Sequence, residues 1–208
     1  MTCVKQREQR VNNNFSGINK IKTVFIEKGI LGSATLVRSP NCDARANEAD
    51  ISLLVIHNIS LPPGKFGGDY VQQLFTNCLK PEDHPYFQEI YQLEVSAHLF
   101  IRRNGDIIQF VPFYQRAWHA GQSHFRGKER CNDFSIGIEL EGSDDQAFTP
   151  EQYEKLTSIT ISLMRHYPRI TADKICGHQH IAYQRKTDPG PEFDWSKYFN
   201  ALKENLKN

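Results

Sequence analysis

The sequence predicts an α/β fold in which a central mixed β-sheet is flanked by α-helices. Three observations support this: a continuous apolar run at Ile51–Ile59, a hairpin signal at Asn104-Gly105, and a capped amphipathic helix that begins after Thr149. Strands and helices are mixed along the chain, and one pair of strands forms a hairpin. This combination favours a mixed sheet with helices packed on it.

The predicted strands differ in how their side chains are distributed. The run ISLLVIHNI is apolar almost throughout, as in a strand covered on both faces, and it ends in His57 and Asn58. EVSAHLFIRR and DIIQFVPF flank Asn104-Gly105, the strongest short-range hairpin signal. FSIGIELEG (134–142) is a further strand, in which alternation places the aliphatic side chains on one face and two glutamates on the other.

Three segments show helical spacing. Asp69 is a candidate cap for a short helix in YVQQLFTNCL, whose apolar positions include Cys78. Thr149-Pro150-Glu151-Gln152 starts a second helix, with Thr as N-cap, Pro at the first helical position and Gln at the third. An apolar stripe continues this helix as far as Tyr167, and a last amphipathic helix is expected at residues 195–206.

The composition is that of one globular domain. The chain has 208 residues, 39% of them hydrophobic, and a formal net charge of +1. This charge does not favour nucleic acid or an anionic membrane as a partner, and no segment approaches the roughly 18 consecutive apolar residues of a membrane span. We expect the polar, asparagine-rich residues 1–20 to be mobile and residues 21–208 to form a single domain.

Two further features favour a cytoplasmic protein. The N-terminal segment MTCVKQREQRVNNNF has no apolar core of a secretory signal. The five cysteines are far apart and include no C-x-x-C pair, so neither a disulfide framework nor a thiolate zinc site is expected.

Proton-active side chains gather in GHQHIAYQRKTDPGP (177–191), a stretch with no helical or strand period. His178 and Asp188 in this stretch, together with His57, would supply two imidazoles and one carboxylate, the ligand type of a catalytic zinc. Spacing alone does not prove such a site, because His57 is distant in sequence. A buried structural histidine and ordinary loop residues remain the alternative.

Glu139 and Lys186 are the other candidates for chemistry. Glu139 is either a partly buried carboxylate whose raised pKa suits a general base or a solvent-facing residue of an edge strand. Lys186 precedes Asp188 by two residues and either stabilises a developing oxyanion or is an ordinary exposed lysine.

Four blocks of sequence resemble one family. They are VIHNISLPPGKFGG, VSAHLFIRRNGDIIQFVPF, RAWHAGQSHFRGKERCNDFSIGIELEG and GHQHIAYQRKTDPGP, which occur in this order between residues 51 and 199. Together they resemble the AmpD-type 1,6-anhydro-N-acetylmuramyl-L-alanine amidases of bacterial cell-wall recycling. The resemblance implies the fold shared by type 2 amidases, T7-type lysozyme and peptidoglycan recognition proteins.

The resemblance also implies roles for individual residues. One zinc ion per chain would be held by His57, His178 and Asp188, with Glu139 and Lys186 as the catalytic residues. His180 matches no ligand position.

The implied substrate is a small anhydro-muramyl peptide, cleaved between 1,6-anhydro-N-acetylmuramic acid and L-alanine in the cytoplasm. Asn58, Trp118 and Arg130 fall on positions similar to residues that line the family's substrate groove. Two alternatives stay open: a non-catalytic peptidoglycan-binding module on the same fold, and an amidase that acts on polymeric peptidoglycan.

Overall fold

The predicted mixed sheet is present in the computed structural model, which describes residues 24–207. In this part of the chain the main sheet has six strands in the order β12-β5-β11-β6-β7-β3. β6 and β7 pair antiparallel, and the other neighbours run parallel. The strands are β3 (Thr35–Leu36), β5 (Leu53–Ile59), β6 (Leu99–Ile101), β7 (Ile107–Gln109), β11 (Ser135–Glu141) and β12 (Ile175–Gly177). The expected mobility of residues 1–20 concerns a segment outside the described residues.

Short strand pairs and helices complete the described chain. The antiparallel pairs are β1 (Ile26–Glu27) with β2 (Ile30–Leu31), β4 (Cys42–Ala44) with β8 (Gln115–Ala117), and β9 (His124–Phe125) with β10 (Lys128–Glu129). The α-helices are α1 (Tyr70–Phe75), α2 (Phe87–Ile90), α3 (Pro150–His166), α4 (His178–Ile181) and α5 (Trp195–Leu206). Single 3₁₀ turns are η1 (Glu48–Asp50), η2 (Pro81–Asp83), η3 (Cys131–Asp133) and η4 (Ala172–Lys174).

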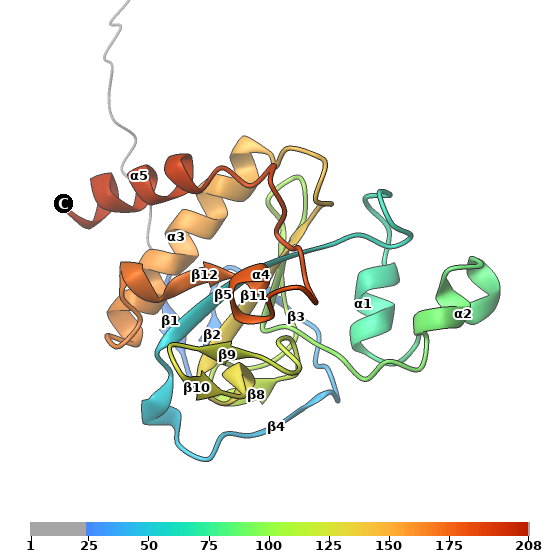
Figure 1. The fold of residues 1–208 in the computed structure, drawn as a ribbon, viewed down its shortest axis with the longest axis horizontal. Coiled ribbons are helices and arrows are strands. Elements are labelled where there is room, and N and C mark those ends of the chain that lie inside the picture. Colours follow the sequence, from blue (N-terminus) through green and yellow to red (C-terminus); the bar gives the residue numbers. More distant parts are fainter. Residues whose placement is uncertain (1–23, 208) are drawn as a thin grey trace, which may run out of the picture.

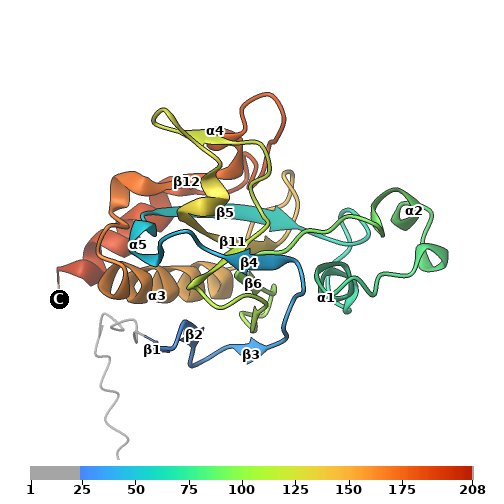
Figure 2. The same cartoon turned by 90° about the horizontal axis from the view of Figure 1, so that it is seen from below.

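Helices cover the sheet unequally. Figure 1 shows α3 and α5 packed together on one side of the sheet, with α1 and α2 projecting as an arm beyond the end of β5. Figure 2 shows α4 on the side of the sheet opposite α3. The main core lies between the sheet and α3, where Ile136, Ile138, Leu156 and Ile159 are fully buried. The opposite face of β5 and β11 is therefore the face free to carry polar groups.

The two strongest local predictions are confirmed. The hairpin turns at Gly105, whose φ of 84° is readily adopted by glycine. At the start of α3, Thr149 accepts from the Gln152 backbone N–H, and the Gln152 side chain accepts from the Thr149 N–H. α5 also spans the predicted residues 195–206.

Two local predictions were wrong. The helix expected in YVQQLFTNCL ends at Phe75, Cys78 is exposed, and the Asp69 side chain makes no capping bond because it pairs with Arg102. The 177–191 stretch is not irregular throughout, since it begins at the end of β12 and continues into α4. β12, at the edge of the sheet, ends at Gly177, and α4 begins at the next residue, His178.

Candidate active site

Parallel strand pairing brings the predicted site residues together. His57 and Glu139 are direct partners across the β5–β11 pair, so their side chains share one face of the sheet. β12 pairs with β5 on its other side, with Gly177 opposite Ile56, and this places His178 beside His57. The site therefore lies toward the carboxyl ends of neighbouring parallel strands, where open sheets usually bind ligands.

His57, His178 and Asp188 form one compact cluster. Asp188 Oδ2 lies 2.9 Å from His57 Nδ1 and 3.1 Å from His178 Nδ1. One donor atom from each of the three residues lies within 4.8 Å of the others. Both histidines are buried, with only 1% and 3% of their surface exposed. The three residues predicted as metal ligands from the sequence are thus adjacent in space.

The chemistry of this cluster fits a metal cation. The Nε2–H of His178 donates to the carbonyl oxygen of Ala120 at 3.2 Å, and a carbonyl can only accept. In the neutral ring, Nδ1 then presents its lone pair to the carboxylate of Asp188. Burial lowers the pKa of His57 to about 4, and the neighbouring His178 adds to this shift, so His57 is neutral near pH 7. Two imidazoles and a carboxylate that converge in this way are the groups that bind a metal cation.

Glu139 faces the cluster from the adjacent strand. It is 8% exposed, and its Oε2 atom is buried without a hydrogen-bond partner among the described residues. Burial raises the pKa of Glu139 well above its ordinary value, the carboxylate of Asp188 raises it further, and the ammonium of Lys186 opposes the rise. The edge-strand alternative is wrong, because β11 lies between β5 and β6 and is buried along its length. An unpaired buried carboxyl of this kind is a candidate proton acceptor.

A groove of about 600 Å³ opens over the cluster. His57, His178, Asp188, Glu139 and Lys186 all line it. The arm that carries α1 and α2 supplies an apolar wall, with Leu61, Phe75, Ile90 and Leu93 among its residues. One side of the groove can therefore hold a polar reacting bond while the other contacts an apolar part of a ligand.

Comparison with known proteins agrees with this geometry. A family model described as N-acetylmuramoyl-L-alanine amidase matches residues 47–191, a range that includes β5, β11, β12 and Asp188. The chain belongs to the N-acetylmuramoyl-L-alanine amidase family. AmpD relatives and AmpD structures that are similar to the chain confirm the resemblance to AmpD-type amidases and the predicted fold class.

Amidases of this family include close relatives of the chain. The 1,6-anhydro-N-acetylmuramyl-L-alanine amidase AmpD of Haemophilus influenzae is 55% identical over 89% of this chain and 100% of its own. A crystal structure of a selenomethionine AmpD derivative has 53% identity and a TM-score of 0.83, covering 86% of this chain and 99% of that one. The amidase AmiD from E. coli, in complex with anhydro-N-acetylmuramic acid-L-Ala-D-gamma-Glu-L-Lys, has 31% identity and a TM-score of 0.55, covering 76% of this chain and 60% of that one.

The three predicted substrate residues of this amidase lie in two places. Asn58 and Trp118 line the groove, and Asn58 Nδ2 donates to Asp144 Oδ1 at 2.7 Å. Arg130 lines a separate pocket of about 410 Å³ and pairs with Asp133 at 3.2 Å. The structure thus brings Asn58 and Trp118 to the cluster and leaves Arg130 outside the groove.

His180 has a structural contact in this amidase. Its Nδ1 accepts from the backbone N–H of Gly177 at 2.9 Å, and its ring packs against Trp195. It is not part of the His57–His178–Asp188 cluster. The sequence reasoning did miss His119, whose Nδ1 lies 2.9 Å from His57 Nε2. A histidine next to the predicted Trp118 was the available signal, but no spacing rule connects it with β5.

Proposed function

We propose that this chain is a zinc-dependent amidase that hydrolyses the bond between 1,6-anhydro-N-acetylmuramic acid and L-alanine in small muropeptides. The observation that carries the proposal is the convergence of two buried imidazoles, one carboxylate and an unpaired buried glutamate in one groove. The substrate follows from the relatives, which include AmpD enzymes named for this bond and AmiD in complex with an anhydro-muramyl peptide.

His57, His178 and Asp188 would hold one zinc ion per chain. Two nitrogens and one oxygen leave a fourth position open, as in catalytic rather than structural zinc sites. When bound, zinc supplies a Lewis acid that polarises a carbonyl and makes water a nucleophile near neutral pH. No serine or cysteine nucleophile is then required for the reaction.

Glu139 would move the proton during hydrolysis. Its carboxylate takes a proton from the attacking water and returns it to the nitrogen of the leaving L-alanine. Burial raises the pKa of Glu139, which makes its carboxylate a stronger base than that of an exposed glutamate. Acid–base catalysis is most effective when the pKa of the group lies near the working pH, so a raised pKa suits a reaction near neutral pH.

Lys186 would stabilise the charge that develops on the carbonyl oxygen. The side chain lines the same groove, and its charge acts on both His57 and Glu139. An ammonium group fixed near a developing oxyanion lowers the barrier without moving during the reaction.

Asn58 and Trp118 would contact the substrate at the groove wall. The bond from Asn58 to Asp144 holds its amide in place, and the indole of Trp118 offers a surface for the sugar or the peptide. Arg130 would contact the stem peptide only if the peptide reaches the separate pocket that Arg130 lines.

The two alternatives differ from this proposal in their products and substrates. A peptidoglycan-binding module would bind muropeptide without releasing peptide, but all three candidate ligands and Glu139 are present. An amidase of polymeric peptidoglycan would cleave intact sacculi. The proposed location is the cytoplasm, as the resemblance to amidases of cell-wall recycling implies. No helix in the described part of the chain is long and apolar enough to cross a membrane.

Peptide release from two substrates tests the proposal. Purified protein is incubated with soluble anhydro-muramyl tripeptide or with intact sacculi, and free peptide is measured by chromatography. We expect rapid release from the anhydro-muropeptide. Binding without release would favour the module, and cleavage of sacculi with no action on the anhydro-muropeptide would favour the polymer-cleaving enzyme.

A further inference from the structure

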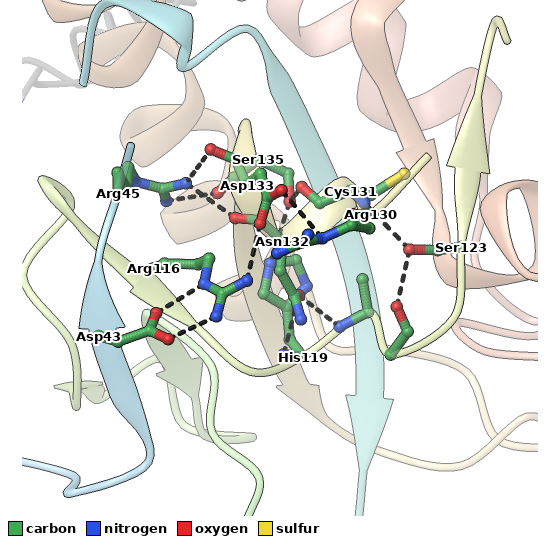
Figure 3. Close-up of polar contacts among 12 residues, drawn as sticks. Asp43, Arg45, Arg116, His119, Ser123, Arg130, Cys131, Asn132, Asp133 and Ser135 are labelled. Carbon is green, nitrogen blue, oxygen red and sulfur yellow. Dashed lines mark hydrogen bonds and ion pairs between the residues drawn. The ribbon is translucent and has the colours of Figure 1, made fainter. Parts of the chain in front are cut away.

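A chain of side chains continues from His57 away from the groove. His57 Nε2 lies 2.9 Å from His119 Nδ1, and His119 Nε2 lies 3.1 Å from Ser135 Oγ. Ser135 Oγ in turn lies 2.6 Å from the carbonyl oxygen of Cys131. Figure 3 shows His119, Ser135 and Cys131 within one network of polar contacts.

The last contact fixes the direction of both hydrogen bonds made by the Ser135 hydroxyl. A carbonyl oxygen can only accept, so the single hydroxyl proton of Ser135 is donated to Cys131. Ser135 Oγ must then accept from His119, which places the His119 proton on Nε2.

The tautomer of His57 follows from that of His119. His119 Nε2 carries the proton that is donated to Ser135, so in the neutral imidazole Nδ1 has the lone pair. Its Nδ1 is then an acceptor for the Nε2–H of His57. His57 is left with an unprotonated Nδ1, the atom that faces Asp188.

The backbone around His119 holds it in this position. A Cβ atom at Gly137 would lie 2.5 Å from His119 Cγ, so the ring packs directly on the bare backbone of β11. Asn132 Oδ1 accepts from the N–H groups of both His119 and Ala120, at 3.2 and 2.8 Å. The carbonyl of Ala120 is the acceptor for His178, so one anchored dipeptide contacts both histidine ligands.

We propose that His119 is a positioning residue that holds His57 with its proton on Nε2 and its Nδ1 directed at the metal, and that Ser135 sets the tautomer of His119. The proposal rests on the proposed function, because it concerns the same metal site. Partners on the far nitrogen of a ligating histidine typically change metal affinity by about 10- to 100-fold.

Zinc affinity of the full-length protein tests this proposal. Dissociation constants are measured by competition with a coloured chelator for wild type, His119→Ala, His119→Asn and Ser135→Ala. We expect His119→Ala to weaken zinc binding by about 10- to 100-fold. His119→Asn places an amide oxygen where Nδ1 stood and should restore much of the affinity. Ser135→Ala should fall between wild type and His119→Ala.

Ser162→Ala is the matched control. Ser162 Oγ donates to the Ser158 carbonyl and accepts from Val24 N–H, so it repeats the bonding of Ser135 at a site on α3. Its loss should lower stability without changing zinc affinity.

In the His119→Asn background, Ser135→Ala should have no further effect on zinc affinity, because an amide oxygen is an acceptor whatever its neighbours are.

A second measurement keeps the proposal testable if a variant fails to fold. Proton–nitrogen NMR spectra of metal-free wild type report which nitrogen of His57 carries the proton, and we expect Nε2. A proton on Nδ1, or folded His119→Ala and Ser135→Ala proteins that bind zinc within twofold of wild type, would overturn the proposal. Wild type that binds no zinc would instead contradict the proposed function.

Discussion

At the scale of single residues, a substitution of Glu139 tests the proposed catalysis separately from metal binding. Replacing Glu139 with glutamine preserves its size but removes its ability to move a proton. We expect zinc binding near the wild-type level and turnover lower by about 10² to 10⁴, the usual contribution of general acid–base catalysis. The measurements are kcat on anhydro-muramyl tripeptide and bound zinc per chain.

Glu141 provides the control for this substitution. It lies two residues further along the same face of β11, where its carboxylate accepts from the N–H groups of Gly67 and Arg103. Glu141→Gln should change stability and leave kcat within about tenfold of wild type, since Glu141 is outside the proton-transfer group. Equal losses for the two variants would show that Glu139 is not the base.

Asp188 and His178 are expected to lose zinc and activity together. Replacing either residue with alanine removes one of the three proposed ligands. Two protein ligands are too few for a catalytic zinc site, which normally has three. Metal content after dialysis and peptide release are the measurements. Asp144→Ala, which removes a groove carboxylate outside the cluster, should keep its zinc. Full zinc retention by Asp188→Ala would remove Asp188 from the ligand set.

At the scale of elements, the capping box of α3 gives a stability prediction. Thr149→Ala removes the acceptor for the Gln152 N–H and should lower the free energy of unfolding by about 1 kcal/mol. Thr149→Ser retains the hydroxyl oxygen and should remain close to wild type. Chemical denaturation measures both variants. If alanine and serine are equally stable, the capping bond does not contribute to stability.

Elements with strong local signals could be predicted from the sequence, and the others could not. The Asn104-Gly105 hairpin and the Thr149 capping box depend on a few neighbouring residues, so their patterns are visible in the sequence. Two-residue strands such as β1 and β9 have no period to detect. α1 ends at Phe75 although the apolar spacing continues, because Asn77 adopts a left-handed φ of 58° that cannot continue a helix.

The candidate site also combines residues that the sequence indicated with residues that only the fold reveals. The resemblance indicated His57, His178 and Asp188, but only the β12-β5-β11 order shows why residues more than a hundred positions apart meet. His119 contacts His57 across 62 positions through tertiary packing, which no local pattern encodes. Whether these residues bind metal and catalyse the reaction stays a prediction, as does a single domain over residues 21–208.

For the whole molecule, buried neutral histidines predict a loss of stability in acid. Burial lowers the pKa of His98 well below its ordinary value, and Arg45 lowers it further. The unfolded chain therefore binds a proton near pH 6.5 that folded His98 does not bind, so its contribution to stability is present above that pH and declines below it. His57, with a pKa of about 4, contributes in the same direction.

Denaturation of metal-free protein at pH 7 and pH 5 measures this effect. The free energy of unfolding should decrease between these pH values, although Glu139, whose pKa is raised, acts in the opposite direction. His98→Asn should destabilise the protein more at pH 7 than at pH 5, since the variant has lost the titrating group. An equal effect of the substitution at both pH values would show that His98 is not held neutral by the fold.

The central claim concerns a zinc-dependent reaction in one groove, and zinc removal and replacement during the amidase assay tests it most directly. Peptide release from anhydro-muramyl tripeptide is measured for the purified protein, after treatment with a chelator, and after zinc is added back. We expect activity to disappear with the chelator and to return at about one zinc per chain. Full activity in protein shown to contain no metal would contradict the account.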